Sequence, residues 1–221
     1  MKKRTDKYGL TLIEMLIVVG IIALLTAMIV GIARRIDNQS KERLAENTIA
    51  IINTALGQFK DYGYDYNDVD YRGFVFPLDC SGFNPVGPGG LIETLQIATG
   101  TANPADGINP LGSHLNEYSG CEVMYFLLSQ IPECKTTLDK IDKSLTTSKG
   151  SNNQNMNITV GGQIYPLLRI IDPWGTTLRY DYYDETAATL SKMIDSRRTF
   201  PVVISAGPDK VFNTIDDIRS R

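Results

Sequence analysis

The feature that most constrains the fold is an uninterrupted apolar run near the N-terminus. Residues 10–33 are LTLIEMLIVVGIIALLTAMIVGIA and contain one charged side chain, Glu14. A helix of this length extends about 36 Å, enough to cross a hydrocarbon layer of about 30 Å. The run therefore predicts a transmembrane helix over 10–33. It is longer than the apolar part of a secretory signal, for which a cut after Ala33 is the alternative.

Charge differs between the two sides of this run. Residues 1–9 hold four cations and one anion, a net charge of +3, whereas the remaining 212 residues hold 18 cations and 24 anions, a net charge of −6. The basic segment favours a cytoplasmic N-terminus, a tendency that Arg34 and Arg35 at the far end weaken. Nucleic-acid binding depends on cations placed against phosphates, so we expect no nucleic-acid partner for the acidic remainder.

Glu14 is the unusual residue of the apolar run. A carboxylate within a membrane segment costs a few kcal/mol on insertion scales and indicates a function. Because Glu14 lies only four residues into the run, an ordinary anchor whose carboxylate reaches the headgroups is the alternative.

The residues around Glu14 resemble the processing motif of type IV prepilins and pseudopilins. A basic leader over 1–9 ends in Gly9, the apolar Leu10 follows, and Glu14 is the fifth residue of the chain that begins there. The resemblance implies cleavage between Gly9 and Leu10 by a prepilin peptidase, followed by N-methylation of Leu10. Leu10 stands where the family usually has Phe or Met.

The resemblance also implies a role for Glu14 in assembly. In filaments of this family the apolar helices pack together, and the glutamate of one subunit is thought to pair with the terminal amine of its neighbour. Unpaired charges in an apolar bundle are costly, so this pairing would set the register between subunits. The implied product is a homo-oligomeric filament, drawn from the inner membrane by an assembly platform and its ATPase. The C-terminal domain would lie on the periplasmic or extracellular side.

The helix is predicted to continue beyond the membrane. Residues 34–61 contain no proline, and residues at spacings of three or four form one apolar stripe, namely Leu44, Thr48, Ile51, Ile52, Ala55 and Phe59. This pattern predicts an amphipathic half over 34–61 that docks on a globular domain. A separate second helix is the alternative, but no linker composition supports it.

Residues 62–169 have the composition of an enlarged variable loop region. Turn-forming residues and tyrosines dominate 62–110, and 144–157 has the composition of a flexible, solvated segment. Short helices are predicted within this region over 91–98 and 121–131. Four of its tyrosines offer stacking faces for a glycan or pack against the long helix: Tyr62, Tyr64, Tyr66 and Tyr71.

The three cysteines permit one disulfide after export to an oxidising compartment. The possible bridges are Cys80–Cys121, Cys80–Cys134 and Cys121–Cys134. We favour Cys121–Cys134 because its short loop is easily closed, a gain of ~3 kcal/mol in the chain-entropy model. Three reduced, packed thiols are the alternative.

The C-terminal part predicts strands and an acidic loop. Alternation over 177–183 and a Val/Ile run over 200–205 predict two strands. Asp209, Asp216 and Asp217 then fall within nine residues of a Gly/Pro/Asn-rich turn. Such carboxylates repel one another unless they are solvated or bridged by a cation, and calcium takes both carboxylate and carbonyl oxygens. Taken alone, the pattern favours an exposed acidic loop, since its spacing is not that of an EF-hand.

The order of DPWG at 172–175, two strands and the acidic loop resembles the C-terminal part of type II secretion major pseudopilins. The resemblance implies a C-terminal β-sheet over 170–221, closed by a calcium-binding loop. The implied ligands are the side chains of Asp209, Asp216 and Asp217 and the carbonyls of Ala206 and Val211. Lys210 and Asn213 stand where glycine is common.

Together these patterns predict an α+β, pilin-like fold, in which a long N-terminal helix packs on a small antiparallel sheet. The predicted function is that of a structural subunit of a type IV pilus-like or type II secretion filament, and not an enzyme. A membrane-tethered envelope enzyme or binding module is the alternative. An enzyme finds little support, because the single histidine, His114, lies in a Gly/Asn-rich stretch without a catalytic motif.

Overall fold

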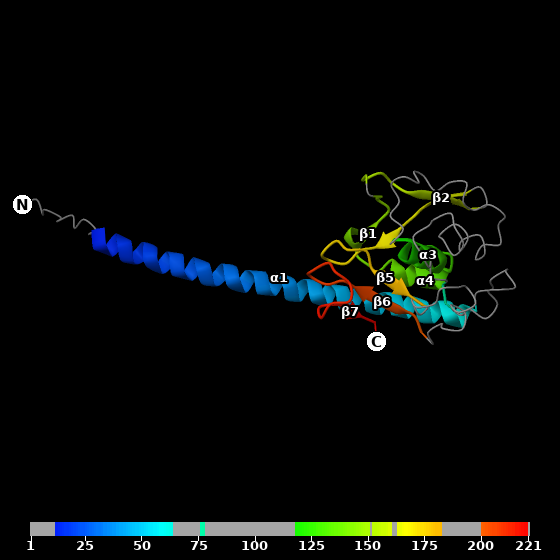
Figure 1. Ribbon diagram of the computed structural model, residues 1–221, viewed down its shortest axis with the longest axis horizontal. Coiled ribbons are helices and arrows are strands. Elements are labelled where there is room, and N and C mark those ends of the chain that lie inside the picture. The colour runs from blue at the N-terminus through cyan, green and yellow to red at the C-terminus, as the bar shows by residue number, and fades with distance from the viewer. Residues whose placement is uncertain are drawn as a thin grey trace, which may run out of the picture. The chain divides into compact units, whose positions relative to one another are not determined.

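The chain divides into two compact units, Met1–Lys41 and Glu42–Arg221. The computed structural model describes residues 12–63, 76–77, 118–150, 152–160, 163–182 and 200–220, of which 29–35 and 159–160 are described by their backbone alone. Within these residues the fold is α+β, with a long N-terminal helix and small antiparallel sheets (Figure 1). This is the predicted pilin-like fold class.

The long helix α1 extends without a break from Leu12 to Tyr62. Its ends carry charges that complement the helix dipole, with Glu14 in the first turn and Lys60 in the last. Gly63 ends the helix in a left-handed conformation with φ of 68°, and its N–H donates to the Lys60 carbonyl. A single continuous helix, and not an anchor followed by a second helix, is confirmed.

Within the second unit, α1 contributes one face to the hydrophobic core. The fully buried positions follow the helical spacing and are Ala45, Thr48, Ile49, Ile52, Ala55, Leu56 and Phe59. Four of the six residues of the predicted stripe are among them. Leu44 is exposed and Ile51 is only partly buried, because the centre of the buried face is rotated toward Ile49 and Leu56.

Among the described residues, two short helices also contribute to the core. Helix α3 covers Ser119–Ser129 and buries most of its length, which confirms the helix predicted over 121–131. Helix α4 covers Pro132–Leu138 and begins at Pro132, where the missing N–H has no intrahelical partner to lose.

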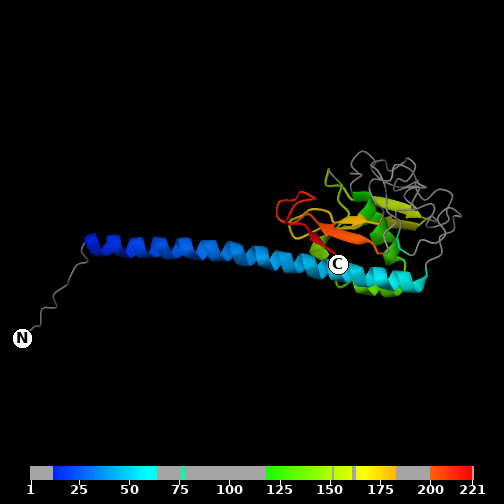
Figure 2. The same ribbon diagram turned by 60° about the horizontal axis from the view of Figure 1, so that its bottom comes forward.

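The strands in the described part of the chain form three small antiparallel sheets. Strand β1 (Thr146–Thr147) pairs with β4 (Arg169–Ile170), and β2 (Asn157–Val160) pairs with β3 (Gln163–Pro166). The third sheet has the order β5-β6-β7 and consists of Arg179–Asp181, Val202–Ser205 and Ile218–Arg219 (Figure 2). Strands β5 and β6 fall within the two predicted strands.

Part of the predicted loop region is ordered structure. Residues 118–169 form α3, α4, the 3-10 turn η4 (Lys143–Leu145) and β1–β3, and they supply core side chains such as Leu145 and Met156. Within the segment 144–157, which was predicted to be solvated, Leu145 and Met156 are buried, whereas residues 152–155 are exposed. The helix predicted over 91–98 lies outside the described residues, as do Tyr64, Tyr66 and Tyr71.

The structure contradicts the predicted Cys121–Cys134 disulfide, because both thiols are free and buried. Cys121 Sγ faces β4, 3.4 Å from the Ile170 nitrogen, whereas Cys134 Sγ donates to the Ala55 carbonyl of α1. Burial raises the pKa of the Cys121 thiol to about 12 and that of Cys134 to about 11, so both are protonated at neutral pH. Cys80 lies outside the described residues.

A buried ion pair links α3 to β4. Arg169 Nη1 lies 3.7 Å from Glu122 Oε1, and both side chains are almost fully buried. The guanidinium also stacks on the Tyr118 ring at 3.7 Å and donates to Thr177 Oγ1 and the Lys149 carbonyl. Arg169 therefore connects four segments of the second unit.

Candidate functional site

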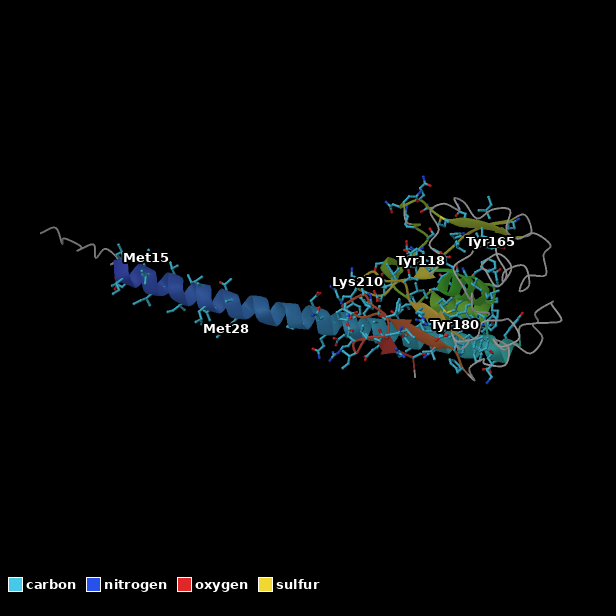
Figure 3. All side chains as sticks on the ribbon, viewed as in Figure 1. Met15, Met28, Tyr118, Tyr165, Tyr180 and Lys210 are labelled. Atoms are coloured by element: carbon cyan, nitrogen blue, oxygen red, sulfur yellow. The ribbon has the colours of Figure 1, made fainter. Side chains whose placement is uncertain are left out.

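The first candidate site is the N-terminal part of α1. Every large apolar side chain from Leu12 to Met28 is exposed, from 47% at Val18 to 84% at Leu12. Figure 3 shows Met15 and Met28 projecting from the helix. These residues lie at consecutive positions and so cover all sides of the helix. A helix that is apolar all round requires apolar surroundings, either lipid or other apolar helices.

The polar groups of this segment are few and local. Glu14 is exposed in the first turn of α1. The Thr26 hydroxyl donates to the Ile22 carbonyl at 2.7 Å, so it needs no partner outside the helix. Gly9, Leu10 and the side chains of 29–33 lie outside the described residues. In the described part of the chain, no helix combines the length and apolarity needed to cross a membrane.

The second candidate site is the loop between β6 and β7, residues 206–217. Gly207, Lys210 and Asn213 have φ near +65°. Gly207 is required for steric reasons as well, since a Cβ there would lie 2.4 Å from the Asp216 carbonyl oxygen. Asn tolerates the left-handed region better than Lys does, so Lys210 is the strained position of the loop.

All three predicted carboxylates accept hydrogen bonds from donors of the loop itself. Asp209 Oδ1 accepts from the Val211 nitrogen at 2.8 Å. Asp216 accepts from the Asp209 nitrogen and, at 2.6 Å, from the Thr214 hydroxyl, and this hydroxyl is the main cause of a lowered Asp216 pKa. Both carboxylates therefore help to close the loop.

Asp217 differs from the other two carboxylates. Its side chain is 2% exposed, and Oδ2 accepts from Arg219 Nη2 at 2.8 Å and from the Asn213 nitrogen at 3.0 Å. Its other oxygen, Oδ1, is buried and makes no hydrogen bond. A buried carboxylate oxygen without a partner is costly, and a bound cation would remove that cost.

The carbonyls predicted as ligands lie in the same loop. Ala206 is buried and Val211 is exposed. The Thr214 hydroxyl lies 3.0 Å from the Val211 carbonyl but closer to Asp216, and it has only one hydrogen to donate. Among the described residues, no three Asp, Glu, His or Cys side chains are grouped so that they could hold a metal. A cation here would depend on carbonyl oxygens and on Asp217, whose unpartnered oxygen fits that role.

The DPWG turn positions this loop, a role that the sequence did not reveal. Asp172 Oδ1 accepts from the backbone nitrogens of Trp174 and Thr176, and Oδ2 accepts from the Ser205 hydroxyl at 2.8 Å. Ser205 Oγ in turn accepts from the Gly207 nitrogen. The turn and the start of the loop are therefore joined through one buried carboxylate. Arg219 was also not identified from the sequence as the ion-pair partner of Asp217, although its position two residues after Asp217 was a usable signal.

Comparison with known families identifies the N-terminal segment. The prokaryotic N-terminal methylation motif matches residues 4–30. The chain is type IV pilin-like. In such proteins the motif is associated with processing by a prepilin peptidase, membrane anchoring and filament assembly, and it indicates a structural subunit instead of an enzyme. Comparison with curated proteins and with solved structures gives no significant match. His114 lies outside the described residues.

Proposed function

We propose that this pilin-like chain is a structural subunit of a type IV pilus-like or type II secretion filament. The observation that carries the proposal is the first part of α1, which exposes apolar side chains on every side and has Glu14 in its first turn. Before assembly, residues 10–33 lie in the inner membrane with the leader on the cytoplasmic side. In the filament, neighbouring helices replace the lipid.

Processing at Gly9 is the first test. Mass spectrometry of protein purified from producing cells is expected to show a mature chain that starts at Leu10 with one added methyl group. Gly9→Val is expected to leave the whole leader attached, because a branched side chain replaces the residue at the cut. Ala33→Val is the control. It alters the alternative cleavage site after Ala33, which we expect not to be used, so this variant should still be cut after Gly9. A chain that begins at Met1, or one that is cut after Ala33, contradicts the proposal.

Within this class we favour a secretion pseudopilin. The support comes from the C-terminal part, where DPWG, the β5-β6-β7 sheet and the acidic loop follow one another. The hydrogen bonds of Asp172 and Ser205 join the turn to the loop, so the three features form one structural unit. Loss of secretion, and not loss of adhesion or DNA uptake, is the phenotype expected on deletion of the gene.

We further propose that the acidic loop binds calcium. Asp217 would be the buried ligand, together with the carbonyls of Ala206 and Val211, because Asp209 and Asp216 do not form a three-carboxylate group with it. The ion would neutralise the Asp217 carboxylate and hold the ends of the loop together.

Calcium is therefore expected to stabilise the full-length protein in detergent. Adding calcium should raise the thermal unfolding midpoint by several degrees, because a ligand that binds only the folded state adds free energy of unfolding. Asp217→Asn should remove this response, whereas Glu133→Gln, an exposed carboxylate on α4, should retain it. Equal midpoints in calcium and in chelator for the unaltered protein would count against the site.

A further inference from the structure

Asp217 already has a cation of the chain beside it. Arg219 Nη2 lies 2.8 Å from Asp217 Oδ2, which makes this a charge-assisted hydrogen bond. The two residues differ in burial, since the Asp217 side chain is 2% exposed and that of Arg219 is 50% exposed. The anion is therefore held in the fold, while its partner is half in solvent.

The carboxylate has two oxygens, and they have different surroundings. Oδ2 accepts hydrogen bonds from the Arg219 guanidinium and the Asn213 nitrogen, whereas Oδ1 is buried without a hydrogen-bond partner. A cation at Oδ1 and the guanidinium at Oδ2 would share a single negative charge. Because two cations on one carboxylate repel each other, each one weakens the binding of the other.

We propose that Arg219 is an internal competitor that sets the calcium affinity of the acidic loop. This inference rests on the calcium site proposed above. With the guanidinium present, the loop is kept in the weak range of extracellular calcium modules, with dissociation constants on the order of 10⁻⁴–10⁻³ M. In the absence of calcium, the same guanidinium compensates the buried charge of Asp217.

The test compares Arg219→Gln with Lys210→Gln in the full-length protein. Both changes remove one positive charge near the loop. Lys210 is exposed, and among the residues that the structure describes the ion pair of Asp217 is with Arg219 and not with Lys210. Calcium affinity is measured by isothermal titration calorimetry after chelation, and the unfolding midpoint by circular dichroism in chelator and in calcium.

Arg219→Gln is expected to bind calcium about tenfold more tightly, which corresponds to about 1.4 kcal/mol. It should also unfold at a lower temperature than the unaltered protein in chelator, and this difference should narrow in saturating calcium. Lys210→Gln should change the affinity much less, because an exposed charge is screened. Arg219→Lys keeps the charge on a shorter side chain, so its calcium affinity should lie between those of the unaltered protein and Arg219→Gln. It also provides the comparison if Arg219→Gln folds only with calcium.

The outcomes separate the two proposals. If the unaltered protein binds calcium and the Arg219 variants bind it with the same affinity as the unaltered protein, the proposed competition by Arg219 is wrong, while the proposed calcium site stands. If Lys210→Gln tightens binding as much as Arg219→Gln does, the effect is one of overall charge and the specific role of Arg219 is overturned. A calcium concentration on the order of 10 mM exceeds the dissociation constants of the weakest calcium modules. If neither the unaltered protein nor Arg219→Gln binds calcium at this concentration, both proposals fail.

Discussion

Replacing Glu14 with leucine is expected to leave the protein cleaved and membrane-inserted but unable to form filaments. The proposed cleavage after Gly9 would create an amine at Leu10, four residues before Glu14. Among apolar helices this amine needs a counterion, and the carboxylate of a neighbouring subunit is the one that we propose. Removing one partner of a buried pair costs about 3–5 kcal/mol, which is more than a hundredfold in an association constant.

The measurement is the filament yield per amount of mature protein in the membrane, scored by electron microscopy after shearing. Glu14→Gln keeps the size and polarity of the side chain but not its charge, so it should assemble nearly as poorly as Glu14→Leu. Glu46→Leu is the matched control, an exposed glutamate further along the same helix. Normal filament yield from Glu14→Leu would contradict the assembly role, while failure of cleavage would point to a role in processing.

The second large effect concerns the buried pair of Glu122 and Arg169. Arg169→Met is expected to lower the free energy of unfolding of the second unit by about 3–5 kcal/mol, because it leaves a buried carboxylate without its cation. For a domain of this size the thermal midpoint should fall by roughly 6–20 °C. Cysteine oxidation does not confound the measurement if it is made under reducing conditions.

A double-mutant cycle isolates the interaction from other losses. The double variant Glu122→Gln/Arg169→Met should lose less free energy of unfolding than the sum of the two single variants. Each single variant leaves one buried charge without its partner, whereas the double variant removes both charges. Glu133→Gln, on the exposed side of α4, should stay within about 0.5 kcal/mol of the unaltered protein. Additive losses in the cycle would show that the two side chains act independently.

What the sequence could predict depended on local pattern. The course of α1 follows from an apolar run and a helical stripe that need no distant partner. Strand β5 follows from alternation of residue types and β6 from a Val/Ile run. The acidic loop was likewise visible, because its carboxylates are close together in the chain. The processing motif was readable for the same reason.

What the sequence could not predict depended on side-chain direction and distant contacts. Cys121 and Cys134 are close in the chain, but one faces β4 and the other faces α1, so their separation in sequence was misleading. The pair of Glu122 and Arg169 joins residues that are far apart in the sequence, and no local pattern marks it. Apart from α3, the structured part of 118–169 was not predicted, because a few buried residues within a polar segment carry little periodic signal.

The DPWG turn contains the residue that dominates the intrinsic fluorescence of this chain. Trp174 is the single tryptophan, its backbone nitrogen is held by Asp172, and the same carboxylate is bonded to the residue that precedes the loop. All indole emission from the protein therefore originates at this turn. A rearrangement of the loop that disturbs the contacts of Asp172 is therefore expected to change this emission, without a label and without altering a residue.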